Sequence, residues 1–264
     1  MKKLTIQKRK QGKVLDRVLL AAGIAFLCVF CITGYFLLRY YGEYRETKEL
    51  NDRIAELRQA EADGDNGGKS ASQAADSPET DGGTIEKSLR MVNADYIGWI
   101  TIPDTEIYYP VVQRDNSYYL SHDFTGEKNS HGAIFLDENC SFESGILLIH
   151  GHHMKDGTMF GGLKNYKKES FRREHGVIYL DRGEGDEAFE IFAAALIDLT
   201  EEGYFDYQEL PAGEAERAAY LEKLRSSAFW YGDTEEPAGT ILLLSTCEYG
   251  SSDERLVVAA VQKE

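Results

Sequence analysis

The sequence is poor in positive charge. It has 29 Lys and Arg against 45 Asp and Glu, which gives a formal net charge of −16 at pH 7. A protein that binds a nucleic-acid backbone needs a basic surface to neutralise the phosphates. This balance therefore argues against nucleic acid as the main partner. Internal repeats are also lacking, while the hydrophobic share of 42%, with 16 tyrosines, is enough for a sizeable core.

Cysteine is scarce, and its spacing does not match a disulfide framework. Cys28 and Cys31 lie inside an apolar run, where we interpret them as small apolar residues and not as a redox pair. Two alternatives remain open for Cys140 and Cys247. They could form a structural disulfide in an oxidising exterior, or Cys247 could be a free reactive thiol and Cys140 an incidental small residue.

Charge is absent from one long segment, Val18 to Leu38, whose 21 residues are apolar or small apart from Thr33 and Tyr35. At about 1.5 Å per residue such a helix spans the roughly 30 Å hydrocarbon core of a bilayer. A cleaved signal peptide also starts with basic residues, but its apolar core has only about 7–15 residues. We therefore predict an uncleaved membrane anchor. Residues 1–41 hold eight basic side chains against one acidic one, so we expect a cytoplasmic N-terminus and an extracellular body.

The chain is thus predicted to have four parts: a cytoplasmic basic segment 1–17, a transmembrane anchor 18–38, a stalk and flexible linker 39–84, and a folded domain 85–264. The stalk mixes Glu, Arg, Lys and Leu in a pattern typical of a helix over 41–62. The following residues are rich in Gly, Ser, Ala and Asp and indicate a flexible spacer.

Strand patterns separated by turn residues dominate the folded domain. They are Gly98–Ile102, Ile107–Gln113, Ala133–Leu136, Ile146–His150, Val177–Leu180, Phe189–Ile197, Thr240–Ser245 and Leu256–Gln262. Helical spacing marks an opening helix over Ile85–Tyr96 and a second helix near Gly213–Ser226. About eight strands with few helices predict a mainly β fold, a closed or nearly closed β-barrel.

The most informative motif is the end of one apolar strand. Leu244 is followed by Ser245, Thr246 and Cys247, and Arg255 opens the next β-branched run. A cysteine at the end of a rigid strand can serve as a thiolate nucleophile. A cation on the neighbouring strand suits a developing oxyanion. The alternatives are a cysteine that is merely a small buried residue and an arginine at a solvated strand edge.

Three histidines, His150, His152 and His153, follow another apolar strand. A metallo-hydrolase pattern H-x-H-x-D-H would need Asp at 154 and His at 155, where this chain has Met154 and Lys155. The sequence offers no second ligand cluster, so we expect no metal and no other cofactor. His152 is predicted to exchange protons with the cysteine thiol, whereas His150 and His153 are interpreted as polar loop residues without a catalytic role.

Together these segments resemble the class B sortases, which are membrane-anchored cysteine transpeptidases of Gram-positive bacteria. The resemblance rests on the strand-end motif 244–247, the histidine motif 151–160 and Arg255. Residues 98–100, 109–113, 115–120 and 122–124 also look like the N-terminal half of the family. The resemblance covers the chain from about Ile85 onward.

The resemblance implies an eight-stranded sortase barrel and a role for each residue. Cys247 attacks the carbonyl after a Thr in the sorting motif of a secreted protein and forms a thioester. An amine of a peptidoglycan precursor or cross-bridge then resolves it. His152 moves the protons, Arg255 stabilises the oxyanion, and Ser245 and Thr246 contact the substrate.

Class B members tend towards sorting motifs of the Asn-Pro-x-Thr type, and the resemblance leads us to expect such a motif here. Three alternatives stay open: a pilin-polymerising sortase that uses a lysine amine, a purely hydrolytic cysteine peptidase, and a non-catalytic surface-binding module on a membrane stalk. The chain shows no second hydrophobic segment after the catalytic motifs, which favours protein anchoring over pilus assembly.

Overall fold

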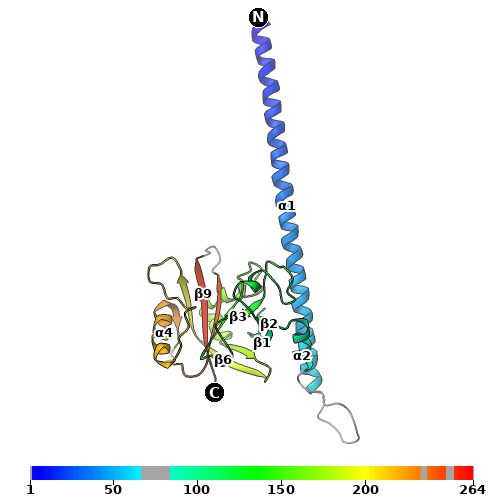
Figure 1. The fold of residues 1–264 in the computed structure, drawn as a ribbon. Coiled ribbons are helices and arrows are strands. Elements are labelled where there is room, and N and C mark those ends of the chain that lie inside the picture. The colour runs from blue at the N-terminus through cyan, green and yellow to red at the C-terminus, as the bar shows by residue number, and fades with distance from the viewer. Residues whose placement is uncertain (1, 67–83, 233–236, 248–252, 264) are drawn as a thin grey trace, which may run out of the picture. The chain divides into compact units, whose positions relative to one another are not determined.

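A computed structural model describes residues 2–66, 84–232, 237–247 and 253–263 (Figure 1). The chain divides into two compact units, Met1–Lys48 and Glu49–Glu264. The described residues of the first unit, 2–48, are all helical and belong to α1 (Lys2–Asn66). The second contains the sheet and all other helices.

Helix α1 contains the apolar run. A candidate membrane span lies within Leu19–Gln59, where an 18-residue window has a mean hydropathy of 2.3 and none of its residues is buried. Phe26 and Leu38 are 74% and 76% exposed, and large apolar side chains exposed in this way fit a lipid surface. The predicted stalk helix is present, but it is continuous with the apolar run. It extends through residues 63–66, which composition assigns to the flexible spacer; 67–83 lie outside the described residues.

The C-terminal part of α1 packs within the second unit. Ile54 is 6% exposed and joins a cluster that includes Leu89 and Trp99. The Arg58 guanidinium lies 4.8 Å from the centre of the Trp99 ring, and its Nη2 lies 2.5 Å from Asp181 Oδ2. Residues 49–59 are therefore structurally part of the folded unit and not only a spacer in front of it.

Nine strands form one sheet. They are β1 (Tyr96–Thr101), β2 (Tyr108–Gln113), β3 (Ile134–Leu136), β4 (Ile146–His150), β5 (Val177–Asp181), β6 (Asp186–Asp198), β7 (Ala228–Tyr231), β8 (Ile241–Cys247) and β9 (Glu254–Gln262). Their order is β5-β1-β2-β3-β4-β8-β9-β6-β7, and β5 also pairs with β6. That last pairing closes eight strands into a barrel, while β7 extends the sheet beside β6. The predicted eight-stranded barrel is confirmed.

Five further helical elements flank the barrel. They are α2 (Thr84–Val92), the 3-10 helices η1 (Tyr118–Leu120) and η2 (Gly161–Lys167), α3 (Glu169–Glu174) and α4 (Glu214–Ser227). The second predicted helix, near Gly213–Ser226, is present as α4 (Figure 1). Its Tyr220 and Leu224 are buried. The opening helix stops at Val92 because Tyr96 already begins β1. The sequence pattern does not predict β7, since its four residues are only partly buried and show little alternation.

The rigid centre of the barrel is the parallel pair β4 and β8. Ile146–Ile149 and Ile241–Leu244 are 0–4% exposed, as is typical of strands covered on both faces. Burying one Leu or Ile side chain stabilises a fold by about 1.5–3 kcal/mol. Eight such residues therefore hold the two strands in a fixed register, and whatever follows each strand end is fixed with it.

Candidate active site

The strand registers bring the three predicted catalytic residues to one end of the barrel. His150 is the register partner of Ser245 in the parallel β4–β8 pair, and the Gly151 N–H donates to Ser245 O at 3.1 Å. His152 lies two residues after His150, and Cys247 lies two residues after Ser245. In the antiparallel β8–β9 pair, Cys247 is directly opposite Arg255. At Cys247 the structure describes the backbone alone.

His152 is oriented by the segment around η1. Its Nε2 lies 2.7 Å from the carbonyl oxygen of Leu120. A carbonyl only accepts hydrogen bonds, so Nε2 carries the proton, and in the neutral ring Nδ1 keeps the lone pair. Gly132 makes room for the ring: with φ at +62°, a Cβ on Gly132 would lie 3.0 Å from His152 Cδ2. Gly132, just before β3, thus forms part of the surface that contacts the His152 ring; this surface, together with the Leu120 carbonyl, is called the histidine seat below.

The loop that starts at His152 is closed on itself. The Phe160 N–H donates to His152 O at 3.0 Å, and His153 and Met159 form a β-bridge. Met159 has a φ of +51°, and its N–H donates to the Tyr109 hydroxyl at 3.0 Å. These hydrogen bonds join the two ends of the loop, 152–153 and 159–160, and so fix the backbone at His152. In the described ranges, no group of three His, Cys, Asp or Glu gathers as a metal site.

The two predicted substrate contacts, Ser245 and Thr246, are both 2% exposed. The Ser245 hydroxyl forms a 2.8 Å hydrogen bond with the Tyr207 hydroxyl, and the Tyr220 hydroxyl donates to Tyr207 O at 2.6 Å. Thr246 Oγ1 is buried without a hydrogen-bond partner among the described residues. Ser245 therefore anchors the β6–α4 connection to β8 through Tyr207, a residue that sequence reasoning missed because it lies 38 positions away.

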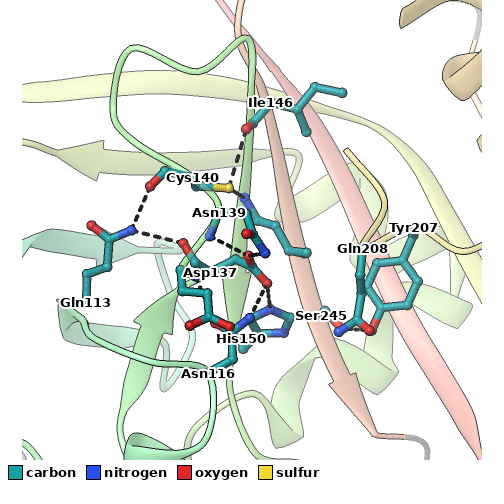
Figure 2. A network of polar contacts seen from close by, with 12 residues as sticks. Gln113, Asn116, Asp137, Asn139, Cys140, Ile146, His150, Tyr207, Gln208 and Ser245 are labelled. Atoms are coloured by element: carbon teal, nitrogen blue, oxygen red, sulfur yellow. Dashed lines mark hydrogen bonds and ion pairs between the residues drawn. The ribbon is translucent and has the colours of Figure 1, made fainter. Parts of the chain in front are cut away.

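His150 has a partner that the sequence did not indicate. Its Nε2 lies 2.9 Å from Asp137 Oδ2, which also accepts from Asn116 Nδ2 at 2.9 Å, while Oδ1 accepts the Asn139 N–H at 2.9 Å (Figure 2). Burial acts to raise the pKa of Asp137, which is 1% exposed, but the hydrogen bonds from His150, Asn139 and Asn116 outweigh it and hold that pKa below its usual value. His150 is therefore a bonded strand-end residue and not a free loop histidine.

Cys140 is a free, buried thiol, so the alternative of a disulfide with Cys247 is wrong. Its Sγ donates to Ile146 O at 3.6 Å (Figure 2). The same sulfur accepts the Leu148 N–H at 3.4 Å. Burial raises the pKa of Cys140 to about 11. Since a neutral thiol is a poor nucleophile, Cys140 is a packing residue.

Comparison with known proteins agrees with this architecture. Residues 100–263 match the family model of the Sortase domain. Sortase B of Listeria monocytogenes is 34% identical over 166 residues, 61% of this chain and 66% of that protein, just under two thirds of its length. Sortase B of Staphylococcus aureus is 31% identical over 185 residues, 66% of this chain and 72% of that protein.

Solved structures give the same result. Sortase B from Bacillus anthracis superposes with a TM-score of 0.67 and 29% identity over 85% of this chain and 99% of that one. Sortase B of Clostridium perfringens gives a TM-score of 0.61 and 30% identity over 68% of this chain and 100% of that one. The chain belongs to the sortase family. Its relatives place it in class B.

Proposed function

We propose that this protein is a cysteine transpeptidase with Cys247 as its nucleophile, His152 as its proton carrier and Arg255 as its oxyanion donor. The observation that carries the proposal is the register of three adjacent strands. β8 ends on Cys247, Arg255 lies opposite it as the second residue of β9, and the chain leaving β4 carries His152 two residues beyond the register partner of Ser245. Register partners of an antiparallel pair share one face of the sheet, so positions 247 and 255 lie on the same face.

The acylation step follows from these roles. The Cys247 thiolate attacks the carbonyl carbon of the scissile peptide bond, and the negative charge that develops on the oxygen is stabilised by the Arg255 guanidinium. Before the attack, His152 takes the proton of the Cys247 thiol, and as the C–N bond breaks it gives that proton to the leaving amine. Its Nε2 is engaged with Leu120 O, so Nδ1 is the nitrogen that we assign to this transfer. The products are a thioester on Cys247 and a free downstream peptide.

Deacylation reverses the proton path. A primary amine attacks the thioester, His152 takes a proton from the attacking nitrogen, and the sulfur leaves as the thiolate, so the enzyme is regenerated and a new amide is formed. A sortase B has been solved in complex with triglycine, a peptide that presents such an amine. That complex supports an amine of a peptidoglycan precursor or cross-bridge as the acceptor.

For the substrate we propose a secreted protein whose C-terminal sorting motif, of the Asn-Pro-x-Thr type, is cleaved after Thr. The side chains of Ser245 and Thr246 are buried, so we expect them to act on the peptide through the backbone of β8 and through the position of Tyr207. The candidate span in α1 supports a single-pass anchor with a cytoplasmic N-terminus and the barrel outside, where secreted substrates pass.

The test uses the full-length protein in detergent with a fluorescence-quenched Asn-Pro-x-Thr peptide and triglycine. Cys247→Ala is expected to lower turnover by at least about a thousandfold, whereas Cys28→Ala, which removes a thiol from α1, should stay within about twofold of the parent. Mass spectrometry should find the Thr–Gly product. Equal product from Cys247→Ala would refute the nucleophile, and a parent enzyme whose turnover triglycine does not raise would be a hydrolytic peptidase. A product formed only with a lysine side chain would indicate pilin polymerisation.

A further inference from the structure

We propose that His131 and Asp156 form a buried ion pair that positions His152 for proton transfer. The inference rests on the proposed function and assigns a positioning role to two residues outside the three-residue site. His131 lies between β2 and β3, and Asp156 lies in the loop that begins at His152. Their side chains approach to 3.7 Å between Nε2 and Oδ2.

The protonation state of His131 follows from its neighbours. Asn129 Oδ1 accepts the backbone N–H of His131 at 3.0 Å, which fixes this atom as the amide oxygen, and it lies 3.2 Å from His131 Nδ1. An amide oxygen only accepts, so Nδ1 carries a proton. The other nitrogen, Nε2, faces a carboxylate. A lone pair there would be repelled by Asp156, whereas a proton is attracted, so the geometry favours the imidazolium.

Burial makes this pair a strong constraint. The His131 side chain is 0% exposed and that of Asp156 is 22% exposed. Charges that are removed from water interact more strongly than charges at the surface. Breaking one member leaves the other charge buried, which is costly. The pair therefore fixes the loop tip to the segment that holds His131.

The same two segments enclose His152. Next to His131, Gly132 lies against the His152 ring, and Asn129 N donates to Ser121 O at 3.0 Å, one residue beyond the Leu120 carbonyl that binds His152 Nε2. On the loop side, Asp156 Oδ1 accepts the Thr158 N–H at 3.0 Å. The two carboxylate oxygens thus have separate roles, since Oδ1 shapes the loop and Oδ2 faces His131.

The expected effect of losing the pair is on chemistry and not on peptide binding. The peptide contacts that we propose involve the backbone of β8 and the position of Tyr207, whereas His131 and Asp156 lie in the two segments around His152. A loose loop would instead let the His152 ring move off the Leu120 carbonyl. Misplacement of a catalytic group by about 1 Å can cost on the order of a hundredfold in rate.

The test is a double-mutant cycle on the full-length protein with the peptide and triglycine assay. His131→Leu and Asp156→Asn should each lower kcat by about tenfold to a hundredfold with KM within about twofold of the parent. The double variant should lose no more than the worse single variant, because both remove one interaction. His131→Gln keeps an N–H donor that can reach Asp156, so it should recover most of the kcat that His131→Leu loses.

Asp198→Asn is the matched control, since Asp198 Oδ1 accepts the Thr200 N–H at 2.8 Å in the same Asp-x-Thr turn. It should keep kcat. If His131→Leu does not fold, as judged by its thermal transition, Asp156→Asn and His131→Gln carry the test, because both keep polar groups in place. Additive losses, a rise in KM with unchanged kcat, full activity of Asp156→Asn, or Gln no better than Leu would each overturn the proposal. An inactive parent would instead overturn the proposed function.

Discussion

Gly132 offers a sharp test of how the histidine is seated, through Gly132→Ala. The φ of +62° is a left-handed conformation that costs a residue with a Cβ about 1–2 kcal/mol. The added Cβ would also overlap the Tyr119 carbonyl oxygen, so that carbonyl must move. It accepts the Ala133 N–H at 3.0 Å, and weakening this bond costs about 1 kcal/mol more.

The total is about 2–3 kcal/mol, which for a domain of about 150–250 residues lowers Tm by about 2–4 °C per kcal/mol. The control is Gly183→Ala. Gly183 also has a positive φ, +96°, but its Cβ would meet nothing within 4 Å, so only the backbone strain remains. Scanning calorimetry should find the larger fall in Tm for Gly132→Ala.

Activity separates the two glycines more clearly. Displacing the Tyr119 carbonyl shifts the adjoining Leu120 carbonyl that binds His152 Nε2, and the new methyl group presses on the His152 ring. We therefore expect Gly132→Ala to lose about tenfold or more in kcat and Gly183→Ala to retain it. Equal Tm values for the two variants together with an unchanged kcat in Gly132→Ala would refute the account of the histidine seat.

Two further predictions concern the buried groups in Figure 2. Asp137 has a lowered pKa, so its stabilising contribution is present above the ordinary carboxyl pKa of about 3.9 and is lost as pH falls through the lowered value. Asp137→Asn should therefore lower the unfolding free energy at pH 7 by about 1.5–3 kcal/mol and flatten the acid limb of a Tm-against-pH curve; an unchanged acid limb would contradict this. With a pKa of about 11, Cys140 should resist iodoacetamide at pH 8 in the folded protein and react after denaturation, as read by peptide mass spectrometry, and rapid labelling of folded protein would contradict its burial.

The parts of the site that could be predicted are those encoded by neighbours in sequence or by a contiguous motif. Cys247 and Arg255 lie on consecutive strands, so pattern alone places them together, and the eight barrel strands carry clear apolar runs. The Asp137–His150 and Ser245–Tyr207 contacts join residues 13 and 38 positions apart, and only the folded registers bring them together. The end of the stalk helix could not be predicted either, because helical structure continues through residues that composition assigns to a spacer.

The catalytic constellation that we propose divides into a rigid part and an adjustable part. The backbone positions of Cys247 and Arg255 are fixed by the β8–β9 hydrogen-bond ladder, whose strands are buried along most of their length. A single side-chain substitution should therefore change their spacing little. His152 follows the end of β4, and its ring direction depends on Leu120, Gly132 and its own loop. Substitutions that slow the chemistry without touching the three residues should therefore cluster around His152, in the segments 119–132 and 153–160. In the function that we propose, the barrel fixes the backbone at Cys247 and Arg255, and these loops determine whether His152 is positioned to transfer protons.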